Sequence, residues 1–155
     1  MCRLRRPKTI YLISCAKKQL NVDIHIIAAA LYVSPLFRLM LRYALLCTKG
    51  DIERIYILSS KHGLLKLTDK VCPYDVSLEA LSKEEKENWS RKIANGLKNE
   101  GYSLATDRFV ILAGNASVHY ITGPDKIRKF KQPLRNKRLG EKLNFLKEEI
   151  EKKRS

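Results

Sequence analysis

Three short apolar runs place the strongest constraint on the fold of this chain: residues 9–15 (TIYLISC), 54–59 (RIYILS) and 108–113 (RFVILA). Each run is rich in β-branched and aromatic residues and lacks polar alternation, so each is predicted to be a strand buried on both faces. Helical patterns separate the runs, and strands that alternate with helices favour crossover connections and a parallel sheet. We therefore expect a single α/β domain over residues 9–150, with a short, mainly parallel sheet between two layers of helices.

The helices are predicted from their start and stop signals. Ser34, followed by a proline, is typical of an N-cap, and the apolar periodicity behind it continues to about residue 49. Ser82 and Glu85 have the spacing of a capping box and begin a second helix, whose apolar stripe is one-sided. A third helix is predicted from about residue 136 to residue 150.

Three segments lie outside this regular pattern. Residues 1–8 are rich in Arg and Lys and hold little that can pack, so they are predicted to form a flexible basic arm. Residues 151–155 are predicted to be a frayed basic tail. Residues 23–31 contain three consecutive alanines, which favour a short helix, with irregular core structure as the alternative.

The charge balance indicates an anionic partner. Lys and Arg number 31 against 16 Asp and Glu, which gives a formal net charge of +15 on 155 residues. Such an excess favours polyanions, so we expect nucleic acid, either DNA or RNA, as the partner. The alternative is a lysine-rich solvated surface, but in such proteins acidic residues usually increase in parallel, and here they do not.

The apolar residues and cysteines bear on location and cofactors. Arg38 and Arg42 interrupt the longest apolar stretch, which is shorter than the roughly 20 residues that a membrane helix requires, so no membrane association is expected. The four cysteines are scattered and lack the spacing of a zinc site or a disulfide framework. We therefore expect a cytoplasmic protein without a metal or another cofactor.

Polar and glycine-bearing segments follow each of the three predicted strands. In open parallel sheets, ligands bind beyond the carboxyl ends of the strands, so these segments form the predicted site. The residues after the second strand are the components of an anion-binding turn, with an ordinary turn, in which His62 caps a backbone group, as the alternative. The candidates at the three strand ends are Ser14, Lys17, Lys18, Ser59, Ser60, Lys61, His62, Gly63, Gly114 and Asn115.

The connection between residues 63 and 82 is too long for a simple link and is a candidate functional loop. It contains Tyr74, whose ring can stack on a base, and Asp75, whose carboxylate can orient a water molecule. The alternatives are a tyrosine that fills the core and an aspartate that caps a turn. The amide of Asn115 can likewise either pair with a base edge or belong to a turn.

A resemblance to a known domain family is carried, in order, by the segments ISCAKK (13–18), LYVSPLF (31–37), IYILSSKHGLL (55–65), PYDVSL (73–78), the predicted helix that contains Trp89, VILAGNASVHY (110–120) and PLRNKRLGEKLNFL (133–146). Together they resemble an uncharacterised family of phages, bacteria and archaea. Its members share a Ser-Cys-x-Lys-Lys strand end, a Leu-Tyr-x-Ser segment, an Ile-Leu-Ser-Ala-Lys-x-Gly-Leu turn and a Tyr-Asp loop. That family is similar to the peroxide-stress YaaA family and, more distantly, to the uracil-DNA glycosylase-like domains attached to archaeal tRNA-guanine transglycosylases.

The resemblance implies a uracil-DNA glycosylase-like fold, a nucleic-acid substrate and a modified base. Asn115, Ser117 and His119 depart from the family, in which an aromatic residue is expected soon after the glycine. The chain also lacks the Gly-x-Asp-Pro-Tyr water-activating motif of the authentic uracil enzymes, so another carboxylate must act, and Asp75 is the best placed. The residues that match the family motifs are Ser14, Lys17, Lys18, Tyr32, Ser34, Ser59, Ser60, Lys61, Gly63, Tyr74, Asp75 and Gly114.

These observations lead to a nucleic-acid base-processing enzyme, most specifically an N-glycosidic hydrolase, with Asp75, Lys61 and His62 as its catalytic residues. Tyr74 stacks on the flipped base in this hypothesis, and Asp75 orients water or stabilises the developing oxocarbenium ion. One alternative is a non-catalytic nucleic-acid-binding module, which the charge favours. The other is a nucleotide or phosphosugar enzyme, for which the chain lacks any Walker or Rossmann glycine pattern.

Overall fold

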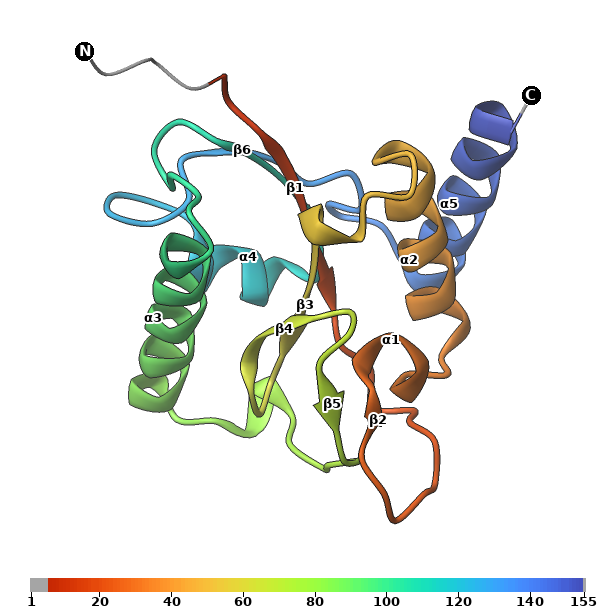
Figure 1. The fold of residues 1–155 in the computed structure, drawn as a ribbon, viewed down its shortest axis with the longest axis horizontal. Coiled ribbons are helices and arrows are strands. Elements are labelled where there is room, and N and C mark those ends of the chain that lie inside the picture. Colours follow the sequence, from red (N-terminus) through yellow and green to blue (C-terminus); the bar gives the residue numbers. More distant parts are fainter. Residues whose placement is uncertain (1–5, 155) are drawn as a thin grey trace.

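The computed structural model describes residues 6–154 and contains a five-stranded sheet with the strand order β4-β3-β1-β6-β7 (Figure 1). β1 (Thr9–Ser14) lies at the centre and pairs in parallel with β3 (Ile55–Ser59) and β6 (Arg108–Leu112). β7 (Lys129–Lys131) continues the sheet in parallel beside β6, and β4 (Gly63–Lys66) pairs antiparallel with β3. The three predicted strands are the central strands of a mostly parallel sheet, so the predicted α/β class is confirmed.

Helices cover both faces of the sheet (Figure 1). α2 (Pro35–Cys47) and α5 (Leu139–Arg154) pack on one face, and α3 (Lys83–Asn99) and α4 (Asn115–Ile121) pack on the other. Successive side chains of β1 enter the two cores in turn, as expected for a strand that is buried on both faces. In the described part of the chain, residues 6–154, no helix combines the length and apolar character needed to cross a membrane.

The predicted caps start the helices where the sequence indicated. The hydroxyl oxygen of Ser34 accepts a hydrogen bond of 3.0 Å from the backbone N–H of Phe37 at the start of α2. At the start of α3, Ser82 accepts from the N–H of Glu85 at 3.1 Å, and the Glu85 carboxylate accepts from the N–H of Ser82 at 3.0 Å. The predicted capping box is therefore confirmed, and it fixes the start of the helix that covers one face of the pocket region.

Short elements account for most differences between the prediction and the structure. Residues 23–31 were expected to be helical, but β2 (Ile26–Ile27) pairs antiparallel with β5 (Lys70–Val71), and only the single turn α1 (Ala28–Leu31) is helical. The connection after residue 63 is not one long loop, because it contains β4 and β5. These strands have two to four residues, too few for a periodic pattern to reveal them.

The ends of the described chain also differ from the prediction. The last helix begins at Leu139 rather than at Asn136, whose positive φ of 58° is incompatible with a helix. It continues through Arg154, so residues 151–154 are helical rather than frayed, and three cations in the last turn favour the helix dipole. Of the predicted arm, Lys8 donates its N–H to Asp107 at 2.8 Å, while residues 1–5 and 155 lie outside the described residues.

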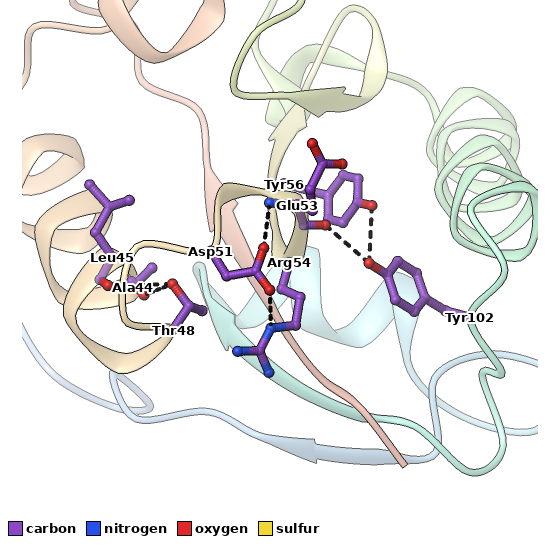
Figure 2. A network of polar contacts seen from close by, with 8 residues as sticks. All are labelled: Ala44, Leu45, Thr48, Asp51, Glu53, Arg54, Tyr56 and Tyr102. Atoms are coloured by element: carbon purple, nitrogen blue, oxygen red, sulfur yellow. Dashed lines mark hydrogen bonds and ion pairs between the residues drawn. The ribbon is translucent and has the colours of Figure 1, made fainter. Parts of the chain in front are cut away.

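A polar network fixes the start of β3, at the edge of the sheet opposite the strand ends of the predicted site (Figure 2). The Asp51 carboxylate accepts from the N–H of Glu53 at 3.2 Å and from Nε of Arg54 at 3.0 Å. The Tyr102 hydroxyl donates to the carbonyl of Glu53 at 3.0 Å and accepts from the Tyr56 hydroxyl at 3.3 Å. The turn before β3 is thereby tied to the segment after α3.

The capping box leads to a stability prediction. We expect Ser82→Ala to lower the free energy of unfolding by about 1 kcal/mol, because the N–H of Glu85 loses its acceptor. Urea denaturation followed by circular dichroism measures this difference. Ser82→Thr keeps the hydroxyl and serves as the matched control, and equal losses in the two variants would contradict the role of the cap.

Candidate functional site

A pocket of about 210 Å³ lies at the carboxyl ends of β1, β3 and β6, and we call it the strand-end pocket. The parallel pairing of these three strands brings their ends to one edge of the sheet, and the loop after β5 completes the wall. Six predicted residues line the pocket: Ser14, Lys17, Ser60, Tyr74, Asp75 and Gly114. Residues predicted at the strand ends and residues predicted in the loop therefore line the same cavity.

A network of buried hydroxyl groups supports the pocket from beneath. Ser59 Oγ donates a hydrogen bond of 2.8 Å to the Tyr74 hydroxyl, which shares a second hydrogen bond of 2.6 Å with the Tyr32 hydroxyl. Ser59 and Tyr32 are fully buried, so these two predicted residues position Tyr74 and do not reach the pocket themselves. The ring of Tyr74 packs against the core and lies edge-on to the His62 ring, with 5.4 Å between the ring centroids.

Burial keeps these tyrosines protonated. It raises the pKa of Tyr32 to about 12, against an ordinary value of 10.0. Burial also raises the pKa of Tyr74, and the neighbouring Cys15 thiol adds to the effect. Both phenols are therefore neutral at physiological pH.

The turn after β3 is an internally bonded hairpin turn. Ser59 Oγ accepts from the backbone N–H groups of Lys61 at 3.3 Å and His62 at 3.0 Å, so these two amides already have a partner. Gly63 has a φ of +79° and pairs with Ser59 as β4 begins, and a Cβ at this position would lie 3.2 Å from Cβ of Lys92. The glycine is thus required by the hairpin, since such a φ disfavours other residues.

The Lys61 and His62 side chains are not among those that line the strand-end pocket. Both line a separate hollow on the neighbouring surface, together with His25 and Cys72, whose Nδ1 and Sγ atoms are 3.2 Å apart. Partial burial, followed by the positive charges of Lys61 and Lys92, lowers the pKa of His62 below its ordinary value of 6.5. The imidazole is therefore neutral at physiological pH.

Three further predicted residues also lie outside the pocket lining. Lys18 is exposed, and Ser34 is engaged as the cap of α2. Asn115 is exposed at the start of α4, where its Oδ1 accepts from Gln132 Nε2 at 2.8 Å and its Nδ2 donates to Asn136 Oδ1 at 3.4 Å. The Asn115 amide therefore joins α4 to the segment that precedes α5.

Two carboxylates line the pocket. Asp75 is exposed, and within residues 6–154 its carboxylate has neither a hydrogen-bond donor nor an ion-pair partner. Glu79, which the sequence analysis did not single out, accepts a hydrogen bond of 2.5 Å from the Ser77 hydroxyl. That bond, its own backbone N–H and nearby Lys17 hold the pKa of Glu79 below its ordinary value. Lys17 lines the same pocket as the two carboxylates.

Other residues that the sequence analysis missed hold the pocket wall in place. Gln19 accepts from the N–H of Tyr74 at 2.9 Å and donates to the carbonyl of Ala16 at 3.1 Å, which ties the loop to the end of β1. Trp89 on α3 lines the pocket and donates its Nε1–H to the carbonyl of Ser59 at 2.8 Å. Gln19 follows the Lys-Lys pair, and that proximity is the only sequence signal that could have found it.

The side chains that line the pocket determine which ligands it can bind. Among residues 6–154, no three His, Cys, Asp or Glu side chains gather in a group that could hold a metal ion. The pocket combines carboxylates, a lysine, hydroxyls and two aromatic rings. Such a set can bind a flat polar ligand and place a carboxylate and a cation against it.

The raised tyrosine pKa values predict a loss of stability at alkaline pH. An unfolded tyrosine loses its proton near pH 10, whereas Tyr32 in the folded protein keeps its proton to about pH 12. Between these values the folded state binds more protons, so the free energy of unfolding falls by up to about 1.4 kcal/mol per pH unit for one such group. The contribution is complete below pH 10 and is lost as the pH rises to 12.

Urea denaturation across this pH range tests the prediction. The decline in stability should be shallower for Tyr32→Phe than for the wild type, because the variant lacks the group whose pKa is shifted. Tyr120→Phe, outside the hydroxyl network, should follow the wild type. Three parallel curves would show that Tyr32 does not contribute.

Comparisons with known proteins and families complete the description of the site. No curated protein matches the chain. A family model described as "Family of unknown function (DUF6884)" matches residues 10–148, from β1 to α5, and the match includes every residue of the strand-end pocket. The prediction of an uncharacterised domain family is thereby confirmed. The chain belongs to the family of unknown function DUF6884.

Proposed function

We propose that this protein is an N-glycosidic hydrolase that releases a modified base from DNA or RNA, with the strand-end pocket as its active site. The proposal rests mainly on Asp75. Its carboxylate lies on the wall of a small pocket and has no hydrogen-bond or ion-pair partner within residues 6–154, and the chain has a net charge of +15. The uncharacterised family that the sequence resembles is similar to the YaaA family and, more distantly, to uracil-DNA glycosylase-like domains. That resemblance implies a nucleic-acid substrate and a modified base but no established reaction, and a common fold with these domains is part of the proposal.

The size and lining of the pocket support a single base as the ligand. Sites for drug-sized molecules enclose about 300–1,000 Å³, and a pocket of about 210 Å³ suits a smaller, flat group. Tyr74, which is partly exposed, provides aromatic surface for stacking, whereas Trp89 is buried, with 4% of its surface exposed, and shapes the wall. The Ser117 hydroxyl, which has no hydrogen-bond partner within the described chain, is available to the edge of the base.

The proposed reaction uses the two carboxylates and the lysine of the pocket. Hydrolysis breaks the bond between C1′ of the sugar and the base nitrogen, whose electron pair leaves with the base, and joins C1′ to a water oxygen. Asp75 orients that water and takes its proton, while ionised Glu79 adds negative charge opposite the oxocarbenium-like sugar. Lys17 offsets the charge of the departing base, which finally receives the proton.

Lys61 and His62 have smaller roles in this proposal than the sequence analysis gave them. Lys61 follows the pocket residue Ser60 and is placed to contact a phosphate beside the flipped nucleotide. His62 takes no chemical step. A phosphate cradle in the turn after β3, as a nucleotide or phosphosugar enzyme would use, has less support, because Ser59 already binds the Lys61 and His62 amides.

Substitution of Asp75 tests the proposal. We expect Asp75→Asn to slow base release by about 10²- to 10⁴-fold, the usual contribution of a general base, while affinity for the oligonucleotide stays equal or rises. Mass spectrometry measures release from single- and double-stranded oligonucleotides that carry uracil, hydroxymethyluracil, hypoxanthine or methylated bases. Asp23→Asn, at an exposed position outside the pocket, is the matched control for the lost charge and should leave release unchanged.

Each outcome has a defined meaning. Release that persists in Asp75→Asn would remove Asp75 from the chemistry, and Glu79→Gln in the same assay would then test the second carboxylate. If no substrate releases a base while all variants bind oligonucleotides tightly, the hydrolase proposal is wrong. A non-catalytic nucleic-acid-binding module would then be the better explanation of the net charge.

A further inference from the structure

Residues 128–138, which we call the basic ribbon, comprise the end of the turn before β7, the edge strand β7 itself and the segment that leads to α5. We propose that the basic ribbon binds the phosphate backbone of a single-stranded nucleic acid and leads that strand to the strand-end pocket. The inference rests on the proposed function, since it names the form of the nucleic acid and the surface that holds it. Its binding step is measurable without any catalysis.

The charge of the ribbon is not compensated. Residues 126–140 include seven Lys or Arg and no Asp or Glu. Lys126 is 3.9 Å from Glu87, but in the described structure no acidic side chain forms an ion pair with any cation of the ribbon itself. The ribbon cations are Arg128, Lys129, Lys131, Arg135, Lys137 and Arg138. Uncompensated cations in a line are what a phosphate backbone recognises.

A groove marks the first half of the ribbon. The strand register pairs Arg108 with Lys129 and Val110 with Lys131, so these side chains share one face of the sheet. Together with Thr9 and Tyr11 of β1 they line a hollow of about 460 Å³. At a rise of about 3.3 Å per residue, Lys129 and Lys131 leave the strand about 6.6 Å apart, so they can reach successive phosphates.

The second half of the ribbon continues to the strand-end pocket. Asn115, which is bonded to Gln132 at 2.8 Å and to Asn136 at 3.4 Å, stands between the pocket residues Gly114 and Ala116. From Arg108 to Gly114 the chain advances by about 20 Å at strand rise, which spans about three phosphates at the spacing of about 6.6 Å that separates Lys129 and Lys131. The groove and the pocket are therefore close enough for one strand to occupy both.

The surface favours a single strand over a duplex. The six cations of the ribbon follow one another along a single segment of chain, so we expect them to contact one phosphate backbone. Phe130 lies on the opposite face of β7 from Lys129 and Lys131, and its side chain is 41% exposed at the open edge of the sheet. Stacking on such a ring requires unpaired bases, and a single strand also avoids the cost of flipping a base from a duplex.

The positive charge of part of the basic ribbon has a simpler explanation. Lysines on an edge strand prevent other chains from pairing with it, and β7 is an edge strand. That explanation applies to Lys129 and Lys131. It does not apply to Arg135, Lys137 and Arg138, which lie beyond the strand, nor to Arg108 on the adjacent inner strand.

A matched pair of triple variants tests the inference. The ribbon variant carries Lys129→Gln, Lys131→Gln and Arg135→Gln, and the control carries Lys98→Gln, Lys147→Gln and Arg42→Gln, which remove the same charges from exposed helix positions. Fluorescence anisotropy measures the affinity of each protein for a labelled single-stranded DNA at several salt concentrations. We expect the ribbon variant alone to bind at least about tenfold more weakly, with a salt slope smaller by about 2, since each lost contact to a single strand removes about 0.7.

Two further arms define the ligand. The same sequence is supplied as single-stranded RNA and as duplex DNA, and Phe130→Ala is compared with the wild type. We expect Phe130→Ala to weaken single-strand binding by about fivefold or more through lost stacking. Equal losses in the two triple variants, or a duplex that binds as tightly as the single strand, would overturn the inference. Thermal unfolding shows whether each variant is folded.

The result separates this inference from the proposed function. Weak binding by the ribbon variant, with no base released by the wild type, would support the ribbon and reject the hydrolase. Base release by the wild type, with equal kcat/KM in the ribbon variant, would support the hydrolase and reject the ribbon. If the hydrolase proposal and the ribbon proposal are both correct, the ribbon variant should have a higher KM for a single-stranded substrate and the same kcat as the wild type.

Discussion

The hydroxyl of Tyr74 accepts a hydrogen bond from Ser59 and shares another with Tyr32, and these bonds hold the loop that carries Asp75 over the end of β3. Each contributes about 0.5–1.5 kcal/mol, but a buried hydroxyl left without a partner costs about 1–3 kcal/mol. Because Tyr32 and Ser59 are fully buried, movement of the loop would break the hydrogen bonds that both make to Tyr74, and Ser59 would keep only the N–H groups of Lys61 and His62 as partners. The wall of the pocket is therefore part of the core, and the site exists before any ligand arrives.

The main framework of the fold was predictable because it follows from local patterns. The three apolar runs became β1, β3 and β6, and Ser34 and Ser82 began helices, since burial and capping act within a few residues. β4, β5 and β7 escaped prediction because each has only two to four residues and depends on a partner strand for its pairing. Within residues 23–31, the three alanines are helical as their propensity indicates, but the helix is limited to α1 because Ile26 and Ile27 pair with β5.

Some residues of the candidate site were also predictable from local patterns, and others were not. The rule that parallel strands end at one edge brought Ser14, Ser60 and Gly114 together, as expected. No pattern could show that Gln19 binds the backbone of Tyr74, because the two residues are 55 positions apart. Nor could it show where the side chain of Lys61 points, since that depends on how Ser59 uses its hydroxyl. Motif spacing locates the edge of the sheet, and long-range hydrogen bonds decide which side chains share its cavity.

The parallel pairing of β1 also has a consequence for synthesis on the ribosome. β1 is made before β3 and β6, its two neighbours in the sheet, and β6 begins only at Arg108. Until then a nascent chain can pair β1 with β3 and cover one face with α2, while the other edge of β1 stays open. An apolar strand with an open edge is prone to pair with other chains. The central position of β1 thus leaves one of its edges open to misassembly during translation until β6 is made.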